Sequence, residues 1–591
     1  MKKKNYLVLS LIGAIGFGSI YLSSCNENQN QVVTNATLTY SAPTNATVSA
    51  YKRVDGVSTK VDLESDSFNA GDVIYLSVNP SDGYQVNTVK FNGSLVRGEN
   101  DIYTLTFVEG TNTLEIEIKF IETDIDDFSF EFNDETKEAV ITSYSLNGNF
   151  PNPLVIPDVV TNNNEEYKVT GINVGVFSSS GVEAIELGVN IKDVSGITFY
   201  DAPNLTTLSV NENNPNFSSE NGILYNKDKT VLISVPSQYA LNPNGSSDFT
   251  INDSVTSIGE YAFAKNRSLK TFNLGNKITS IGEYAFYNIF NLKSITIPDS
   301  CLIIHDYAFS NCTYLSKLNL GKGVKEIGPY AFQSCPELLY LDIPDSLEVI
   351  DEAAFTSNRK LLRIRFGENP SLKEIGVMAF SICDALKEFI APSSLRIIKE
   401  GAFNVCSQMT KLELNEGLES ILDYAFERCY RLPSLVIPSS VTTIRGNPFS
   451  GCELLTATTL TFEEGSNFVN DNGAIYTSDY KTLLALLYRA PLTDGVYEIK
   501  DGCEVIDDYA FYLNISCNKV IIPTSVKTIK KAFQNLLSGA FSIEYKGLMS
   551  EFLTIDIDNA CLVNTTLAGE GVVCLDGTLP YDDFIDSSVF E

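Results

Sequence analysis

Nine phenylalanines recur at an almost constant interval through the middle of this chain of 591 residues. Each follows an alanine or a proline, and the interval is 23 residues at every step except that from Phe355 to Phe380, which is 25. A fixed interval of this size is typical of a solenoid, in which one short unit buries its apolar face only by stacking on copies of itself. The nine residues are Phe263, Phe286, Phe309, Phe332, Phe355, Phe380, Phe403, Phe426 and Phe449.

Each interval contains two extended segments and a turn. A Leu-x-x-Leu-x-Leu segment, as at Leu315, Leu318 and Leu320, alternates with period two and predicts a short strand with one buried face. In other copies a proline such as Pro298 ends this strand, because proline cannot donate to a sheet. A Val-x-x-Ile-Gly segment predicts a second short strand, and Ala-Phe-x-x-Cys predicts a tight helical or 3₁₀ turn on the opposite side.

Together these motifs resemble the BspA-like bacterial leucine-rich repeat, whose pattern is Leu-x-x-Leu-x-Leu-Pro-x-Ser-Leu-x-x-Ile-Gly-x-x-Ala-Phe-x-x-Cys. The resemblance covers about residues 165–540. It implies a leucine-rich repeat solenoid of short parallel β-strands, with turns, 3₁₀ or short helices in each 23-residue coil, preceded by a small all-β domain. It also implies adhesion and the binding of matrix proteins, which we treat as expectations.

Two insertions interrupt the repeats and resemble each other. Asn216–Tyr225 and Asn467–Tyr476 both carry an Asn-Gly pair before an apolar run, and each is followed by Lys-Thr, at Lys229-Thr230 and Lys481-Thr482. Asn-Gly is a strong turn signal. We therefore predict β-hairpins within the solenoid near residues 216–236 and 467–490.

The first residues resemble a bacterial lipoprotein signal. Three lysines at 2–4 precede an apolar run at 7–22, and Leu22-Ser23-Ser24-Cys25 then places small residues before a cysteine. The apolar run is shorter than the ~20 residues of a membrane span. This predicts a signal peptide at 1–24, lipidation of Cys25, and a polar tether at 25–36. An ordinary secretory signal and a membrane-anchoring helix are the alternatives.

The remaining organisation follows from alternation and from the need to cover the ends of a solenoid. Residues 103–107 and 114–120 alternate strictly and predict strands in a small β-rich surface-protein domain at 37–122. A terminal coil would otherwise expose its core. We therefore expect a β-hairpin cap at 123–164, repeats at 165–540 and a C-terminal cap at 541–591.

Composition and missing motifs argue against several classes of function. The formal charge of −32 opposes nucleic-acid binding, which needs a clustered basic surface. His305 is the one histidine, and no Gly-x-Ser-x-Gly, His-Glu-x-x-His or P-loop motif occurs. Carboxylate pairs such as Asp556 with Asp558 lack a calcium-loop pattern and read as solvated turns. The sequence therefore predicts no enzyme, no catalytic residue, no metal site and no cofactor.

Six of the twelve cysteines sit three residues after a repeated phenylalanine. This spacing predicts a stacked column of buried free thiols, since Asn358 takes the same position in one coil. A linear column cannot form the tetrahedron that zinc needs. Neighbouring coils could just reach disulfide distance, so pairing stays an alternative. Cys561 and Cys574 lie outside the column and are the candidate disulfide. The column comprises Cys312, Cys335, Cys383, Cys406, Cys429 and Cys452.

The outward-facing strand residues predict where a partner would bind. In each first strand, the residues on either side of the central buried position point away from the core. Tyrosine and arginine are enriched at binding hot spots, and they meet in the middle of the solenoid. The alternative is a solvated face with cross-strand ion pairs. The predicted site, here called the charged strip, is Tyr340, Asp342, Arg363, Arg365, Glu388, Lys411 and Glu413.

These features predict a non-enzymatic lipoprotein on the extracellular face of a bacterial envelope. Its membrane contact would be the N-terminal lipid alone, and its partner an extracellular protein or glycoprotein. Two alternatives remain: an envelope or biofilm scaffold without a specific ligand, and a glycan-binding accessory protein.

Overall fold

The described residues form two compact units, one up to residue 120 and one from residue 121, which are described separately. The computed structural model describes residues 35–583 apart from 55–56, 82–83, 100–101, 146–150, 179, 240–246, 537–540, 559, 563–564, 566, 568 and 570. The predicted signal peptide, nearly all of the tether and Cys25 lie outside the described residues.

The first unit is all-β, as expected. Its two sheets, ordered β4-β1-β9-β6-β7 and β3-β2-β5-β8, enclose one apolar core. The predicted alternation is present, because Tyr103 and Leu105 of β8 are buried between exposed neighbours. The strands are β1 (Asn35–Tyr40), β2 (Ala46–Val54), β3 (Val57–Val61), β4 (Phe68–Asn69), β5 (Val73–Pro80), β6 (Tyr84–Phe91), β7 (Ser94–Leu95), β8 (Ile102–Thr106) and β9 (Gly110–Phe120).

The second unit opens with a four-stranded sheet, ordered β10-β11-β14-β13, and a three-stranded parallel sheet, β12-β15-β16. The predicted boundary between cap and repeats at 164–165 falls in the turn of the β13–β14 hairpin. The elements are η1 (Ile125–Asp127), β10 (Phe128–Asn133), β11 (Glu138–Tyr144), β12 (Leu154–Val155), β13 (Val159–Asn162), β14 (Glu165–Ile172), β15 (Ala184–Leu187), α1 (Gly196–Phe199) and β16 (Thr207–Val210).

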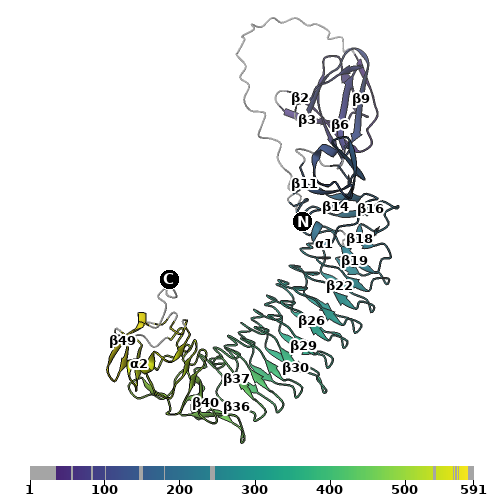
Figure 1. Ribbon diagram of the computed structural model, residues 1–591. Helices are drawn as coiled ribbons and strands as arrows, with labels where there is room; N and C mark the ends of the chain where they lie inside the picture. Colours follow the sequence, from purple (N-terminus) through teal and green to yellow (C-terminus); the bar gives the residue numbers. More distant parts are fainter. Residues whose placement is uncertain are drawn as a thin grey trace. The chain divides into compact units, whose positions relative to one another are not determined.

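The repeats form a parallel β-solenoid, in which each coil contributes one strand to each of two sides (Figure 1). The Leu-x-x-Leu-x-Leu segments make the first side, here called the strand face. Its strands are β20 (Asp248–Thr250), β22 (Thr271–Asn273), β24 (Ser294–Thr296), β26 (Lys317–Asn319), β28 (Tyr340–Ile343), β30 (Arg363–Phe366), β32 (Glu388–Ile390), β34 (Lys411–Glu413), β36 (Leu435–Ile437), β38 (Leu460–Phe462), β42 (Val496–Glu498) and β44 (Lys519–Ile522).

The Val-x-x-Ile segments form the second side, where twelve strands from β17 to β37 make one sheet. The two-residue strands of this side are β21 (Ser257–Ile258), β23 (Ser280–Ile281), β25 (Ile303–Ile304), β27 (Glu326–Ile327), β29 (Val349–Ile350), β31 (Glu374–Ile375), β33 (Ile397–Ile398), β35 (Ser420–Ile421), β37 (Thr443–Ile444), β43 (Val505–Ile506) and β45 (Thr528–Ile529).

The repeated phenylalanines stack along the interior. All nine are fully buried, and neighbouring rings lie nearly parallel, as at 5.0 Å between Phe309 and Phe332. The turns that carry them are not helical but are joined by their own backbone ladder, in which the Phe309 amide donates to the Ala331 carbonyl at 2.7 Å. Each coil is therefore fixed to the next on three sides.

The column of cysteines is buried, and all described cysteines are free. Each column thiol donates to the carbonyl of the phenylalanine one coil earlier, as Cys312 does to Phe286 at 3.2 Å. Asparagine meets the same need: the Asn358 amide donates to the Phe332 and Phe355 carbonyls at 3.0 and 2.7 Å. Asn266 and Asn514 also donate to backbone carbonyls of the preceding coil, those of Pro236 and Leu487, both at 2.7 Å. The position therefore selects a hydrogen-bond donor, as well as the small apolar group that we predicted.

The expected disulfide between Cys561 and Cys574 is wrong, since both cysteines are free. The carbonyl of Cys561 accepts the Phe533 amide, which places Cys561 in the turn ladder. Cys574 ends β48, a strand that extends the strand face through its pairing with β46. The two residues therefore belong to different sides of the coil.

Both insertions are β-hairpins, as predicted, and each turns at its Asn-Gly pair. The third strand of each insertion pairs with the next coil, so the hairpins extend the second side. The register aligns Val231 with Thr482, which makes Lys229 the counterpart of Tyr480 and corrects the Lys-Thr alignment by one residue. The strands are β17 (Phe217–Glu220), β18 (Ile223–Asn226), β19 (Val231–Ser234), β39 (Phe468–Asp471), β40 (Ala474–Thr477) and β41 (Thr482–Leu486).

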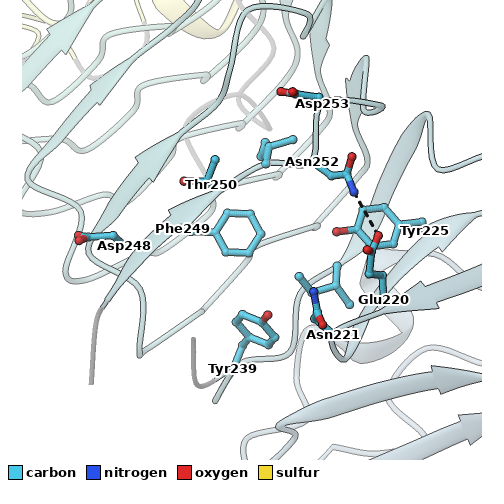
Figure 2. Close-up of a pocket in the computed structure, with 11 residues that line it drawn as sticks. Glu220, Asn221, Tyr225, Tyr239, Asp248, Phe249, Thr250, Asn252 and Asp253 are labelled. Atoms are coloured by element: carbon cyan, nitrogen blue, oxygen red, sulfur yellow. Dashed lines mark hydrogen bonds between the residues drawn. The ribbon is translucent and has the colours of Figure 1, made fainter. Parts of the chain in front are cut away.

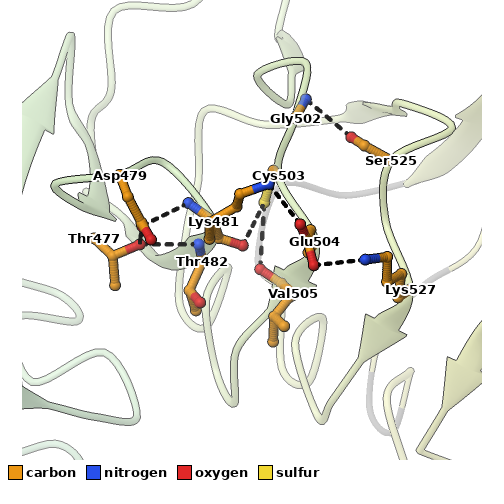
Figure 3. Close-up of polar contacts among 10 residues, drawn as sticks. All are labelled: Thr477, Asp479, Lys481, Thr482, Gly502, Cys503, Glu504, Val505, Ser525 and Lys527. Carbon is orange, nitrogen blue, oxygen red and sulfur yellow. Dashed lines mark hydrogen bonds and ion pairs between the residues drawn. The ribbon is translucent and has the colours of Figure 1, made fainter.

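The C-terminal end closes both sides of the solenoid. The strand face ends in the β48–β49 hairpin and the second side in β47. Near this end Glu504 accepts from Lys481 of the preceding coil and Lys527 of the following coil (Figure 3). These hydrogen bonds lower the pKa of Glu504 to about 2, so it stays charged above that pH. The elements are β46 (Ser542–Tyr545), α2 (Met549–Phe552), β47 (Asp556–Ile557), β48 (Gly571–Cys574), β49 (Gly577–Pro580) and η2 (Tyr581–Asp583).

Candidate interaction surface on the strand face

The four strands β28, β30, β32 and β34 form one parallel sheet and bring the predicted strip residues together. In its register Tyr340 lies beside Arg363, Arg363 beside Glu388, and Glu388 beside Lys411. The central residue of each strand, such as Leu341 or Phe389, is buried, which turns its neighbours outward. The structure therefore places all seven residues of the charged strip on one accessible surface.

The charges of the strip are paired with one another. Arg363 Nε lies 2.6 Å from Glu388 Oε1, and Arg365 Nη1 lies 3.8 Å from Asp342 Oδ1. The Arg365 guanidinium also lies over the Tyr340 ring, 5.5 Å from its centroid. About half of each arginine side chain is exposed, so each pair contributes only about 0–1 kcal/mol and leaves the guanidinium group accessible to a partner.

A break in pairing lies beside the arginines. β30 and β32 pair at Arg363 and Glu388 alone, whereas β32 and β34 pair at three positions. The two extra residues of this coil fall in the loop 367–371. In this loop the Ser371 amide donates to the Asp345 carbonyl at 2.9 Å. A Cβ at Gly367 would lie 2.1 Å from Asp345 Oδ1, so a larger residue there would displace the exposed Asp345 side chain. The longer loop separates the ends of β30 and β32, which leaves Arg365 without a cross-strand neighbour on β32.

Apolar side chains border the strip. Ile390 is 43% exposed and Tyr340 is 48% exposed. An exposed apolar group beside fixed arginines is the composition found in protein–protein hot spots. The strip is thus chemically suited to a protein surface that carries carboxylates and apolar groups.

Sequence reasoning missed a second aromatic column, on the turn side. Tyr261, Tyr284, Tyr307 and Tyr330 stack with ring centroids 4.6 to 4.7 Å apart. Each has a positive φ, which the turn imposes two residues before the phenylalanine. The repeated Tyr-Ala-Phe triplet was visible in the sequence and carries this signal.

The described residues show no arrangement that supports covalent or metal chemistry. Burial raises the pKa of Cys312 and Cys383 to about 12, so both thiols stay protonated and unreactive. No side chain within the described ranges donates to or accepts from the His305 ring. The described part of the chain contains no group of three or more His, Cys, Asp or Glu that could hold a metal ion. No described helix is long and apolar enough to cross a bilayer.

A family model for the BspA type leucine-rich repeat region, in six copies, matches residues 159–240, 237–362, 358–472 and 496–552, together more than half of the chain. No curated protein matches this sequence.

Several solved bacterial leucine-rich repeat proteins are similar to this chain at low identity. A leucine-rich repeat protein from Bacteroides ovatus is 21% identical over 74% of this chain and 99% of its own length, with a TM-score of 0.38. A leucine-rich cell surface protein from Faecalibacterium prausnitzii is 24% identical; the match covers 58% of this chain and 95% of that protein, with a TM-score of 0.35. A leucine-rich repeat protein from Eubacterium ventriosum is 24% identical; the match covers 48% of this chain and 61% of that protein, with a TM-score of 0.31.

Proposed function

Because the chain belongs to the BspA-type leucine-rich repeat family, we propose that it is a bacterial cell-surface protein that binds an extracellular protein or glycoprotein through the charged strip. Surface proteins of this family generally take part in adhesion or protein interaction. The observation that carries the proposal for this chain is the pair of outward arginines beside Tyr340. Attachment through a lipid on Cys25 is part of the proposal.

The charge of the surface sets the expected partner chemistry. Arg363 and Arg365 are adjacent outward cations in a chain with net charge −32. They offer two planar donors for carboxylates, while Asp342 and Glu388 beside them can accept from lysines or arginines. A partner surface of mixed charge with an apolar centre fits this pattern.

The second candidate is an envelope or biofilm scaffold without a specific ligand. It is favoured by one observation, namely that both arginines already have carboxylate partners within the strip. A scaffold would tolerate changes in this strip, whereas a binding module would not. One measurement therefore separates the two candidates, namely partner binding after substitution of the strip.

We expect the double variant Arg363→Glu with Arg365→Glu to lose capture of surface glycoproteins that the wild type retains. Each substitution places like charges together, since the new carboxylates face Glu388 and Asp342. The measurement is a pull-down from solubilised surface glycoproteins, at 0.15 M salt, with the thermal melt recorded for each protein. The matched control is Arg396→Glu with Arg445→Glu, which changes the net charge equally at exposed arginines outside the strip. Unchanged capture by the folded double variant would remove the strip from consideration.

A further inference from the structure

The two hairpin insertions are copies of one structural unit that differ at the same place. Their Asn-Gly turns superpose Glu220 on Asp471 and Tyr225 on Tyr476. The following strand-face strands, β20 and β42, superpose Phe249 on Tyr497 and Asn252 on Lys500. The second copy therefore shows what side chains can occupy the equivalent space in the first.

In the second copy this space is spanned by the chain's own side chains. The Lys500 ammonium pairs with Asp471 and lies over the Tyr480 ring, 4.1 Å from its centroid. The hydroxyl groups of Tyr476 and Tyr497 are hydrogen-bonded to each other at 2.6 Å. A lysine and a phenol hydroxyl thus satisfy the acidic and tyrosine groups of this unit.

In the first copy the ammonium that pairs with the acid comes from Lys229, at the position of Tyr480, and the phenol partner of Tyr225 is absent. Asn252 replaces the lysine and Phe249 replaces the tyrosine, and a cavity of about 900 Å³ lies between the hairpin tip and β20 (Figure 2). Tyr225 lines it, is only 4% exposed, and its hydroxyl has no hydrogen-bond partner among the described residues. Tyr239, also almost fully buried, lines the same cavity.

The cavity is acidic. Glu220, Asp248 and Asp253 line it, and Lys229 pairs with Glu220. Lys229 and Asn252 both donate to the same oxygen of Glu220, Oε2, at 2.9 and 3.1 Å. No described residue donates to its Oε1, which is left to accept from a ligand. Anionic ligands are opposed by this charge balance, and a cationic donor is favoured.

We propose that this cavity binds a lysine side chain of a partner protein, whose alkyl stem and primary ammonium enter beside Asn252 and reach Glu220 next to the ammonium of Lys229. The ammonium donates to Glu220 Oε1, and the stem packs against Tyr239 and Phe249. A ligand hydroxyl or carbonyl engages the Tyr225 hydroxyl, the role that Tyr497 has in the other copy. The proposal stands apart from the charged strip, which lies on other coils.

The test is ligand-observed NMR titration of the full chain with Nα-acetyl-lysine N-methylamide. We expect saturable binding of this probe and none of the norleucine analogue, which has the alkyl chain without the ammonium. Asn252→Lys should fill the cavity as Lys500 does and weaken the probe at least about tenfold. Glu220→Gln, which removes the charge and keeps the shape, should weaken it by a similar factor, since hydrogen bonds to charged groups contribute about 1.5–3 kcal/mol.

The matched control is Asn369→Lys, which adds the same charge in an exposed loop on a distant coil and should bind within about twofold of wild type. Arg363→Glu with Arg365→Glu should also bind the probe like wild type, which separates this site from the strip. Equal binding of the norleucine analogue, or unweakened binding by folded Asn252→Lys, would overturn the proposal. Binding of N-acetylglucosamine in place of the lysine probe would overturn it as well and assign the cavity to a neutral sugar.

Discussion

Replacement of Phe332 by alanine is expected to lower the free energy of unfolding by about 3–5 kcal/mol. The ring is fully buried and stacks between Phe309 at 5.0 Å and Phe355 at 5.2 Å. The Phe332 amide donates to the Ala354 carbonyl at 2.8 Å, and this ladder prevents the neighbouring coils from closing on the space. The cavity would therefore persist, and cavity volume is what makes such substitutions costly.

The measurement is urea unfolding followed by circular dichroism and tyrosine fluorescence, since the chain contains no tryptophan. Phe290→Ala is the control, because that ring is 45% exposed and its loss should change stability by no more than about 0.5 kcal/mol. In a solenoid the coupling is between neighbours, so hydrogen exchange should rise first in the coils beside residue 332. Equal effects of the two substitutions would show that the phenylalanine column does not hold the coils together.

Replacement of Asn358 by aspartate is expected to cost about 3–5 kcal/mol at neutral pH, although the two side chains have almost the same shape. The Asn358 amide nitrogen donates to the Phe332 and Phe355 carbonyls at 3.0 and 2.7 Å, and the residue is fully buried. A carboxylate would direct a negative charge at two carbonyl oxygens in an apolar interior. Asn358→Cys, which installs the donor used by neighbouring coils, is the control and should cost far less.

The pH dependence has a definite sign. Burial without a cation raises the folded-state pKa of the introduced aspartate above its unfolded value of about 3.9. The folded state then binds more protons, so the stability of Asn358→Asp relative to wild type falls as pH rises above the unfolded pKa. Urea midpoints at pH 5.5 and 7.5 test this. A deficit that is equal at both pH values, or smaller at the higher one, would contradict the donor role of this position.

The repeat made most of the fold predictable. The interval between phenylalanines fixed which residues share a column, and the period-two strands fixed which side chains face out. The Asn-Gly pairs located both hairpins. These features depend on short-range patterns, and such patterns repeat visibly when each coil solves the same packing problem.

Features that depend on particular neighbours were missed. Asn266 and Asn514 also occupy the cysteine position, so three asparagines in the sequence indicate a hydrogen-bond donor there, whereas the prediction used Asn358 alone. The prediction that Cys561 pairs with Cys574 was wrong, because their position outside the column does not say which side of a coil each residue occupies. The cavity beside Tyr225 is lined from two distant segments, the hairpin and β20, and its difference from the second copy is visible only once both hairpins are superposed.

The central claim, that the charged strip binds a partner, is tested most directly by a charge-swapped variant. This variant combines four substitutions, which exchange the two residues of each ion pair and keep the net charge constant. They are Arg363→Glu with Glu388→Arg, and Arg365→Glu with Asp342→Arg. Exposed pairs of this kind contribute about 0–1 kcal/mol, so the fold should keep its stability. The account predicts at least a tenfold, or about 1.4 kcal/mol, loss of affinity for the captured surface protein in a binding isotherm. Wild-type affinity in the swapped variant would contradict it.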